Sequence, residues 1–416
     1  MTASSRRPSA RQVMVLFGAF AFAYFISTLI RAVTATLSPV LTDELSLQAH
    51  ELGLLAGGYF LGFALTQLPL GAWLDRHGPR RVEMGFLVVA VAGSAAFALV
   101  DGFAGLLLAR VVLGMGLSAC LMAPLTGYRR WLTPGMQLRA NSWMLMTGSL
   151  GMLASTLPVQ WLLPAVGWRG LFWLLAAALV LSILLLRFAV PAWRPSSEAA
   201  EGVPAAQDWR LADIWRHPYF RLMAPIGFVQ YGGMIAIQTL WAGPWLHRVV
   251  GASPSAVAGG LFAINLSMLL AFWLWGLVNP HLSGRGWPAD RLMAYGLPLS
   301  YGVLACVVWL GPEAGWPWWA AFCVACTPGS LAQPAIAMAM PERAAGRALS
   351  SFNLVLFAGI FCMQWAIGLA IDGFTLLGLA EINAFRAAML VFLLCSMCAY
   401  LVFRIGLARW KVSEQG

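Results

Sequence analysis

The residue whose chemistry stands out first is Arg31, inside the apolar stretch YFISTLIRAV (residues 24–33). Its guanidinium stays charged at any ordinary pH, and a central arginine costs a membrane helix about 2.5 to 3.5 kcal/mol. Steps of three and four residues from Arg31 reach further polar side chains, namely Tyr24, Ser27, Thr34 and Ser38. We expect this stripe to line a water-filled cavity, where the guanidinium binds a carboxylate through paired, charge-assisted hydrogen bonds.

A structural role for Arg31 is the alternative. Its side chain could extend to the membrane surface, or it could pair with Glu44 or Glu51, which follow it in the sequence. Replacing Arg31 with glutamine or lysine distinguishes the roles, because normal uptake by a folded variant would exclude substrate binding.

A second group of candidate binding residues lies in GFVQYGGMIAIQTLWAGPWL (residues 227–246). Helical spacing puts several side chains on one face, with Tyr231 beside it: Gln230, Met234, Gln238, Trp241 and Trp245. These groups suit a ligand with hydrogen-bonding edges and an apolar or planar body, but they also serve as packing or interface anchors. Gly232-Gly233 and Gly243-Pro244 would let the helix bend.

Four more polar residues are candidates for the same cavity: Gln67, Asn265, Asn353 and Gln364. Asn353 and Gln364 are eleven residues apart and share a helix face. Hydrogen bonding between helices is the alternative for all four.

The composition indicates what kind of protein positions these groups. Of the 416 residues, 60% are hydrophobic and 10% are charged, whereas a soluble protein carries about 25% charged residues. The 20 tryptophans, 23 phenylalanines and 42 glycines fit the aromatic belts and close helix contacts of a membrane bundle. We therefore predict an all-α polytopic membrane protein. The sequence shows no nucleophile–base or metal constellation, so we expect no enzyme, cofactor or metal site.

The net charge of +10 follows membrane topology rather than nucleic-acid binding. Apart from Lys411, the Lys and Arg residues are all arginines, and they collect in short loops between apolar runs. The seven cysteines all fall inside predicted spans, where we expect small packing residues. The first apolar run is too long for a cleavable signal peptide. We expect the chain in the inner membrane, with lipid and a small solute as partners and no nucleic acid.

Twelve apolar runs are long enough to cross a bilayer, which takes about 20 helical residues. They begin near residues 13, 52, 83, 103, 141, 171, 221, 256, 292, 316, 349 and 387. A polar stretch divides them into an N-terminal six-helix bundle (1–190), a cytoplasmic linker (191–219) and a C-terminal six-helix bundle (220–416). With a cytoplasmic N-terminus, the outer loops hold only Arg169, Arg248 and Arg386, so we expect both termini in the cytoplasm.

The two halves resemble each other. Arg139-Ala140-x-Ser142 recurs as Arg347-Ala348-x-Ser350, and Gln160-Trp161 recurs as Gln364-Trp365. GAWLDRHGPRR (71–81) and GLVNPHLSGRG (276–286) occupy matching positions after the second and eighth spans. Parallel six-helix repeats are a transporter architecture, with the binding site between the halves.

The motif Gly71-x-x-x-Asp75-Arg76-x-Gly78-x-Arg80-Arg81 carries the most specific resemblance. It resembles the loop between helices two and three of the major facilitator superfamily, and the resemblance covers the whole chain. In that family the loop latches the cytoplasmic side in the outward-open state. Gly71 would allow close helix contact, and Asp75 would cap a helix N-terminus or pair with an arginine. Pro280 stands where Asp75 would match in the second half, so we expect an asymmetric latch.

The resemblance extends to both arginines within spans. Arg110-x-x-x-Gly114-x-Gly116 resembles a family motif whose arginine is buried in the first half. Arg31, followed by DELSLQAHELG, resembles the first-helix arginine of organic-anion members such as the anion:cation symporters, where it contacts substrate carboxylate. GSLGMLASTLPVQW (148–161) lacks the Gly-Pro-x-x-Gly-Gly pattern of drug/proton antiporters. The resemblance thus implies alternating access and favours an organic anion over a drug, and we expect a monomer.

The energy source stays open at this level. The acids gather at loops and helix ends, including Asp43, Glu44 and Glu51 outside, Asp75 and Glu83 inside, and Asp372 near the outer end of the eleventh span. The histidines are peripheral too. Proton symport through an edge group such as Glu51 or Asp372, exchange of anions, and facilitated diffusion all remain.

We therefore predict a secondary transporter that imports a small organic anion, with Arg31 as the anchor. The main alternative is an exporter of amphipathic compounds with a structural Arg31, and uptake against efflux in oriented vesicles separates the two. A metal carrier is disfavoured because Met144/Met146 and Met338/Met340 point to different sides of their helices. A sensor or structural protein is disfavoured by the intact loop motif and the lack of a soluble domain.

Overall fold

The computed structural model describes residues 10–191 and 210–413, which are built from helices without strands. The first half consists of α1 (Ala10–Leu45), α2 (Ala49–His77), α3 (Pro79–Leu99), α4 (Phe103–Leu117), α5 (Ala119–Trp131), α6 (Pro134–Ala154) and α7 (Leu157–Ala189). The second half consists of α8 (Leu211–Arg216), α9 (Pro218–Pro225), η2 (Ile226–Tyr231), α10 (Gly232–Ala236), η3 (Ile237–Trp241), α11 (Ala242–Pro244), η4 (Trp245–Val249), α12 (Pro254–Gly284), α13 (Ala289–Leu310), η5 (Gly311–Glu313), α14 (Trp316–Cys326), η6 (Thr327–Leu331), α15 (Ala332–Ala339), α16 (Glu342–Leu376) and α17 (Glu381–Ser413).

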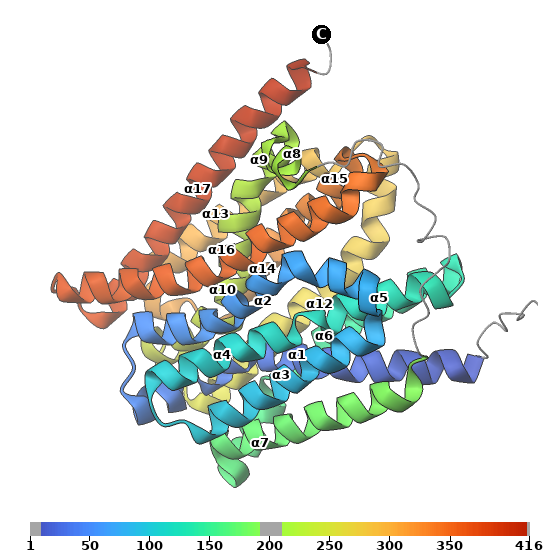
Figure 1. The fold of residues 1–416 in the computed structure, drawn as a ribbon. Coiled ribbons are helices and arrows are strands. Elements are labelled where there is room, and N and C mark those ends of the chain that lie inside the picture. Colours follow the sequence, from blue (N-terminus) through green and yellow to red (C-terminus); the bar gives the residue numbers. More distant parts are fainter. Residues whose placement is uncertain (1–9, 192–209, 414–416) are drawn as a thin grey trace, which may run out of the picture.

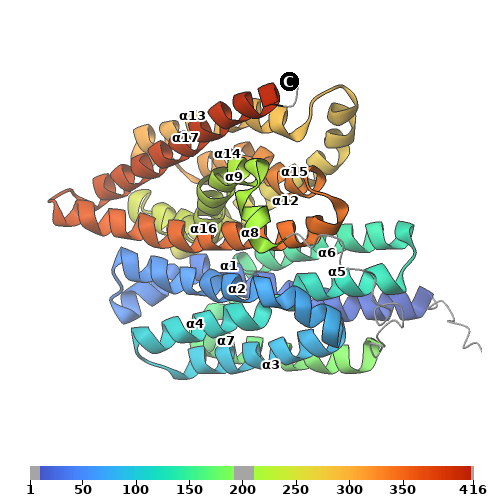
Figure 2. The ribbon, with the colours of Figure 1, turned by 45° about the horizontal axis from the view of Figure 1, so that its top comes forward.

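The two halves form two helical layers. Figure 2 shows α1 to α7 in the lower layer and α8 to α17 in the upper layer, with α2 and α16 facing each other between them. Eleven helices of the described chain are long and apolar enough to cross a membrane. The predicted class, a polytopic all-α membrane protein in two bundles, is confirmed.

The sequence predicts twelve spans, whereas eleven helices of the described chain are long and apolar enough to cross a membrane; the difference is helix α6. Its first turns carry Gln137, Arg139 and Asn141, so α6 is less apolar than the other long helices. Residues 157–166 follow it within α7 up to Gly167, whose φ of 66° breaks the helix. The fifth span is therefore built from α6 together with the start of α7, and the sixth span follows the break.

Several helices begin earlier than their apolar runs. α1 starts at Ala10 rather than near residue 13, and α16 starts at Glu342 rather than near residue 349. Hydropathy marks where a segment enters lipid, whereas backbone hydrogen bonds let a helix continue into the interface. Proline often sets the first turn, as at Pro79 of α3, because its missing N–H has no helical partner there.

The predicted linker (191–219) is only partly within the described chain, because residues 192–209 lie outside it. Its last part is more ordered than expected of a solvated linker. It forms α8, in which Ile214 is fully buried and Asp213 accepts a hydrogen bond from the Arg210 backbone N–H at 2.8 Å.

The helix of the seventh span is irregular. The sequence predicted that its glycines would let it bend, whereas the structure shows π-helical turns. The helix widens to π-type turns at η2, η3 and η4 rather than bending at the two glycine pairs alone. A Cβ on Gly232 would lie 2.7 Å from the carbonyl carbon of Gly359, so this glycine allows α10 to pack closely on α16.

The two ends of the bundle carry different parts of the chain. We call the end with Gly71–Arg81 the motif end; there α2 meets α3 (Figure 1, right). We call the other the opposite end; there α1 meets α2 and α16 meets α17 (Figure 1, left). Large apolar side chains such as Phe188 (82% exposed) cover much of the outside, as expected for a surface that faces lipid.

Candidate functional site

Arg31 lies on α1 where the first half faces the second. Its guanidinium carbon is 5.4 Å from the centre of the Phe63 ring on α2 and 5.9 Å from that of the Phe357 ring on α16. The two rings stack on each other with their centres 4.1 Å apart. Arg31 therefore contacts both halves through aromatic faces, an arrangement that attracts a cation.

Three tyrosines interact electrostatically with the same guanidinium. Tyr24 of α1, Tyr59 of α2 and Tyr231 of η2 all lie within electrostatic range of Arg31, and Tyr59 also makes a polar contact with it. The Ser27 hydroxyl lies 3.4 Å from the Tyr59 hydroxyl. Of the residues predicted from the stripe and from the seventh span, Tyr24 and Tyr231 thus lie within electrostatic range of Arg31, and Ser27 contacts Tyr59.

Arg31 has no acidic partner within the described chain. The ion pairs there do not include it, and its Nε has no hydrogen-bond partner. The side chain is half-buried, so it is shielded from bulk water without being sealed. A cation in this setting gains most from an anion that brings its own hydrogen-bond acceptors.

The structural pairing considered for Arg31 is absent from this conformation. Glu44 accepts a hydrogen bond from Trp168 at 2.7 Å and pairs with Arg169 at 3.6 Å. Glu51 accepts a hydrogen bond from the Gln48 backbone N–H at 2.9 Å and so caps α2. Both carboxylates therefore have other partners, at the opposite end of the bundle.

Arg110 on α4 is the second arginine within a span, and its surroundings differ from those of Arg31. It is fully buried, and it donates to the Ile30 carbonyl at 3.2 Å and to the Thr34 hydroxyl at 2.6 Å. Its guanidinium also lies over the rings of Phe97 (4.8 Å) and Phe172 (5.3 Å). These contacts join α4 to α1, α3 and α7, which is a structural role inside the first half.

The polar side chains of the α1 stripe therefore have different partners and do not line one common cavity. Ser27 lies beside Arg31, whereas Thr34 serves Arg110. Ser38 donates to the Ala35 carbonyl of its own helix at 2.8 Å. Helical spacing alone could not separate these roles, because they depend on which helix packs against each turn.

The polar residues predicted on the seventh span bond within the second half, in this conformation, instead of facing Arg31. All three side chains donate to neighbouring helices: Gln230 to Ser300 (3.1 Å) and Cys326 (3.2 Å), Gln238 to Asn265 (3.0 Å), and the Trp241 indole to the Gln364 carbonyl (3.1 Å). Tyr231, half-buried beside them, is the member of this span that reaches the Arg31 cluster.

The remaining amide candidates are also hydrogen-bonded. Gln364 donates to Thr239 at 2.9 Å, and Gln67 donates to the Phe63 carbonyl at 3.3 Å. Asn353 accepts a hydrogen bond from Gln333 at 2.7 Å. The alternative considered from the sequence, hydrogen bonding between helices, describes Gln364 and Asn353 in this conformation, whereas Gln67 bonds to its own helix α2.

Tyr59, Phe63 and Phe357 contact Arg31 but were not singled out from the sequence. They belong to apolar helix stretches in which an aromatic residue ordinarily signals packing or a lipid interface. A weak signal existed for α2, because Tyr59 and Phe63 are four residues apart and so share a helix face.

Several charged side chains of the loop motif are exposed at the motif end. Asp75 and Arg76 are exposed, and Asp75 makes no hydrogen bond or ion pair with a described residue. Arg80 donates to the Val190 carbonyl of its own half at 3.0 Å. Gly78 has a φ of 78°, which suits the turn between α2 and α3. A Cβ on Gly71 would meet nothing within 4 Å, so the expected close helix contact is absent here.

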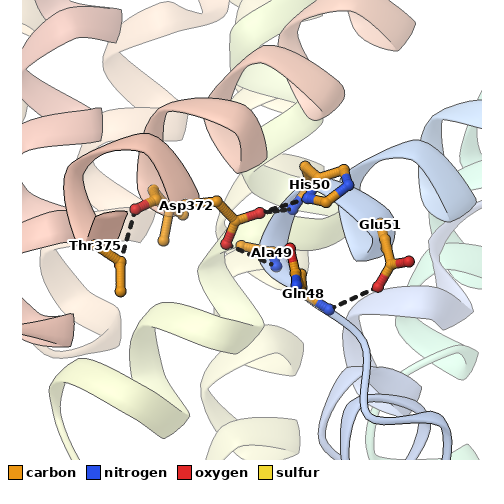
Figure 3. A network of polar contacts seen from close by, with 7 residues as sticks. Gln48, Ala49, His50, Glu51, Asp372 and Thr375 are labelled. Carbon is orange, nitrogen blue, oxygen red and sulfur yellow. Dashed lines mark hydrogen bonds and ion pairs between the residues drawn. The ribbon is translucent and has the colours of Figure 1, made fainter. Parts of the chain in front are cut away.

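Asp372 joins the halves at the opposite end (Figure 3). Its carboxylate accepts hydrogen bonds from the backbone N–H groups of Ala49 (3.1 Å) and His50 (2.7 Å), and it lies 2.7 Å from the His50 Nδ1. Asp372 belongs to α16 of the second half, whereas Ala49 and His50 begin α2 of the first half. A carboxylate at a helix N-terminus is electrostatically favourable.

A hollow of about 360 Å³ lies beside this contact, and Arg31 is not among its lining residues. Its walls include Leu52, Trp241, Arg248, Asp372 and Phe385. Arg248 also spans the halves, 3.3 Å from Asp43 of α1. The polar contacts between halves thus gather at the opposite end of the described bundle.

Comparison with known proteins places these features in context. Residues 20–363 match the family model described as Major Facilitator Superfamily. The probable sulfoacetate transporter SauU of Cupriavidus necator is 25% identical over 72% of this chain and 71% of that protein. The 4-hydroxybenzoate transporter PcaK of Acinetobacter baylyi is 23% identical over 68% of each chain.

Two partial relatives and two solved structures complete the comparison. The hexuronate transporter of Bacillus subtilis is 33% identical over 22% of each chain, and the fosmidomycin resistance protein of Escherichia coli is 23% identical over 44% of this chain and 45% of that one. The structure of a bacterial homologue of the lysosomal transporter Spinster has a TM-score of 0.74 at 17% identity, covering 96% of this chain and 98% of that one. The structure of the POT family transporter PepTSo has a TM-score of 0.77 at 13% identity, covering 97% of this chain and 99% of that one. At these identities the structures support the fold alone.

Proposed function

Because the chain belongs to the Major Facilitator Superfamily, we propose that it carries a small organic anion with a carboxylate group across the inner membrane by alternating access. The family makes it a multi-pass membrane transporter of a small molecule and not an enzyme. The carboxylate and the direction of transport, which is import, are the parts that we propose.

The observation that carries this proposal is the state of Arg31. Arg31 is half-buried between the halves, lacks a carboxylate partner in the described chain, contacts Tyr59, and lies within electrostatic range of Tyr24 and Tyr231. A carboxylate would accept paired hydrogen bonds from the guanidinium, and the tyrosine hydroxyls would satisfy its remaining lone pairs. Arg110 differs because it is fully buried and two of its three guanidinium nitrogens donate hydrogen bonds within the first half, although its Nε also has no partner in the described chain.

The relatives support the same substrate class. Sulfoacetate, 4-hydroxybenzoate and hexuronate, which give three of the matched transporters their names, all carry a carboxylate. A site built from one guanidinium, aromatic faces and hydroxyls suits a carboxylate on a compact or planar body. Phe63 and Phe357 would contact that body.

We assign the motif end to the cytoplasm, since most arginines lie there. The opposite end is then outside, and the contacts of Asp372 and Arg248 close the outer side in this conformation. Opening this side and engaging the motif loop would expose Arg31 to the other face. We expect the transporter to work as a monomer, because the proposed site is contained between the halves of one chain.

Counterflow in liposomes tests the assignment of Arg31. The purified protein is expected to exchange radiolabelled 4-hydroxybenzoate or sulfoacetate, and Arg31→Gln is expected to lose this exchange. Losing a charge-assisted pair of hydrogen bonds costs about 3 kcal/mol, roughly a hundredfold in affinity. Arg31→Lys keeps the charge but not the planar fork, so an intermediate loss is expected.

The matched control is Arg187→Gln, which removes an exposed arginine in the last turn of α7. It should exchange like the unmodified protein. Unaltered counterflow by a correctly folded Arg31→Gln variant would remove the anion-anchor assignment.

Export of amphipathic compounds is the second candidate, favoured by the partial match to the fosmidomycin resistance protein. Vesicles of known orientation separate it from import. Right-side-out vesicles should accumulate the carboxylate if the import assignment is correct, whereas an exporter would concentrate its compound in inside-out vesicles and would be indifferent to Arg31→Gln.

A further inference from the structure

A second hollow, of about 490 Å³, lies on the second half, and its lining residues all belong to α8, α9 and α17. Three of the seven lining residues are exposed arginines, one from each helix: Arg216, Arg221 and Arg409. The fold thus gathers around one hollow three charges that come from two distant segments of the chain.

The course of two long helices places this hollow at the motif end. Arg248, at the end of the seventh span, lies 3.9 Å from Glu381, at the start of α17, and both are at the opposite end. From there both helices cross the bundle, so α9 and the last turns of α17 meet at the motif end, where α9 packs against α17 (Figure 1).

The length of α17 sets the depth of the hollow in the bilayer. The segment from Glu381 to Arg409 has 29 residues. A helix of that length extends about 43 Å, which matches a bilayer of about 40–45 Å including its headgroups. Arg409 is therefore expected at the level of the lipid headgroups.

The three arginines of the hollow have no partner in the described chain. Its ion pairs and side-chain hydrogen bonds do not include Arg216, Arg221 or Arg409. Asp213 of α8 instead accepts a hydrogen bond from a backbone N–H at 2.8 Å, and Asp290 accepts one from a tyrosine of α9 at 2.6 Å. Like charges around one hollow repel one another, so an anion there is stabilised by all three.

The positive-inside bias accounts for arginines at this end but not for this arrangement. Arg80 and Arg291, for example, each donate to a backbone carbonyl at 3.0 Å. The arginines of the hollow make no such bond in the described chain, and their guanidinium groups stay free to bind a ligand.

The rest of the wall is mainly apolar and includes Leu222 of α9 and Val402 and Gly406 of α17. A Cβ on Gly406 would lie 2.5 Å from the Leu222 Cδ1, so this glycine lets α17 pack closely on α9. Val402 (54% exposed) and Ile405 (56% exposed) share a face of α17 with Arg409, because they are spaced by three and four residues. A charged rim therefore adjoins an apolar surface that faces the acyl chains.

We propose that this hollow binds an anionic phospholipid of the cytoplasmic leaflet. The lipid phosphate accepts hydrogen bonds from the three guanidinium groups, whose planar fork suits phosphate oxygens. Its acyl chains lie along Val402 and Ile405. A free phosphate would leave that apolar wall uncovered, and the ammonium group of a zwitterionic lipid would approach the same arginines, so both fit less well.

A lipid in this position joins the start of the seventh span to the end of the twelfth. It contacts α8, α9 and α17 at once, so it is expected to stabilise the second half. The lipid is separate from the transported solute, which we place at Arg31 between the halves.

Native mass spectrometry of the delipidated protein in detergent tests the proposal. The unmodified protein should bind phosphatidylglycerol in preference to phosphatidylethanolamine, and phosphatidylglycerol should raise its melting temperature. A variant that combines Arg216→Gln, Arg221→Gln and Arg409→Gln should bind phosphatidylglycerol about a hundredfold more weakly, since each arginine near an anionic lipid surface contributes about fivefold.

The matched control removes the same charge from exposed arginines of the first half, by combining Arg11→Gln, Arg129→Gln and Arg187→Gln. This variant should bind phosphatidylglycerol like the unmodified protein. An equal loss in both triple variants would overturn the proposal, because binding would then follow net charge rather than the hollow.

A second pair of variants tests the apolar wall while keeping every arginine. Val402→Trp crowds the hollow and should weaken phosphatidylglycerol binding about tenfold. Leu401→Trp is the control, because Leu401 is equally exposed (54%) and is not among the lining residues. Unchanged binding by Val402→Trp, or displacement of the lipid by excess inorganic phosphate, would indicate a site for a free anion and overturn the lipid assignment.

These measurements contain no transported solute, so their outcome is independent of the role of Arg31. Equal binding of phosphatidylglycerol and phosphatidylethanolamine would overturn the lipid site and leave the anion anchor intact. Normal exchange by Arg31→Gln would instead overturn the anchor and leave the lipid site intact.

Discussion

The two ends of the bundle differ in how the halves meet. At the opposite end, Asp372 accepts hydrogen bonds from two backbone N–H groups at the start of α2 and lies 2.7 Å from the His50 Nδ1, and Arg248 approaches Asp43 across the halves. At the motif end, Asp75 is exposed and has no partner in the described chain, although its motif resembles a latch.

This difference indicates that the structure shows the conformation in which the opposite end is closed. A transporter that alternates between two openings needs contacts that hold each end in turn. Among the described residues, the ion pairs and hydrogen bonds between the halves that we find lie at the opposite end. The latch motif is expected to act in the other conformation, so its exposure is a property of this state.

The largest effect is expected from Gly368→Val. A Cβ at Gly368 would overlap the Ala49 carbonyl and lie 2.7 Å from the His50 Cα, so the valine would force α16 away from α2. Overpacking of this kind costs about 2 kcal/mol, roughly a thirtyfold shift away from closure of the opposite end. Labelling of Thr42→Cys, which lines the hollow, by an impermeant maleimide should increase accordingly. Unchanged labelling would mean that closure tolerates the added bulk.

Asp372→Asn should act in the same direction more weakly. The amide keeps an acceptor for one N–H of α2 but loses the charge that favours the helix N-terminus, a loss of about 1 to 2 kcal/mol in a partly buried setting. The same labelling assay measures it. Asp372→Glu is the control that keeps the charge, and labelling of Asp372→Asn at the unmodified level would exclude a closing role for this carboxylate.

Arg248→Gln should change closure only slightly. Its contact with Asp43 is 3.3 Å long and exposed to solvent, and such pairs contribute about 0.2 to 1 kcal/mol. High salt should weaken whatever effect appears, because exposed charges are screened. An effect larger than that of Asp372→Asn would reverse the order of the two contacts.

The smallest effect on this conformation is expected from Asp75→Asn. The side chain is exposed and unpartnered, so the thermal stability of the purified protein should change by no more than about 0.5 kcal/mol. Transport should nevertheless slow, because the substitution weakens the latch of the other conformation. A variant that is destabilised yet transports normally would contradict this division of roles.

Much of the fold could be predicted from the sequence because its signal is local. An apolar run of bilayer length must form a helix, since lipid offers no partner for the backbone polar groups. The arginines within spans, Arg31 and Arg110, could also be identified from the sequence. A charged residue inside an apolar run stands out however the helix packs. Helix ends were less predictable, since caps such as that of Glu51 on Gln48 lie outside the apolar run.

The partners of the polar side chains were the part that could not be predicted. Gln230 and Gln238 resembled cavity residues on a helical wheel, yet neighbouring helices satisfy them. Glu83 resembled an edge acid and is buried. A side chain's partner depends on residues far away in the chain, and no periodicity within one helix carries that information.

The amino-acid sequence by itself therefore determined that this chain spans a membrane as two bundles, and that Arg31 and Arg110 are charges within spans. The packing of the helices places Arg110 in hydrogen bonds within its own half, and it places Arg31 between the halves without a carboxylate partner in the described chain. The physical reason is that hydropathy acts on each segment separately, whereas the neutralisation of a charge requires groups from other helices to come within hydrogen-bonding distance.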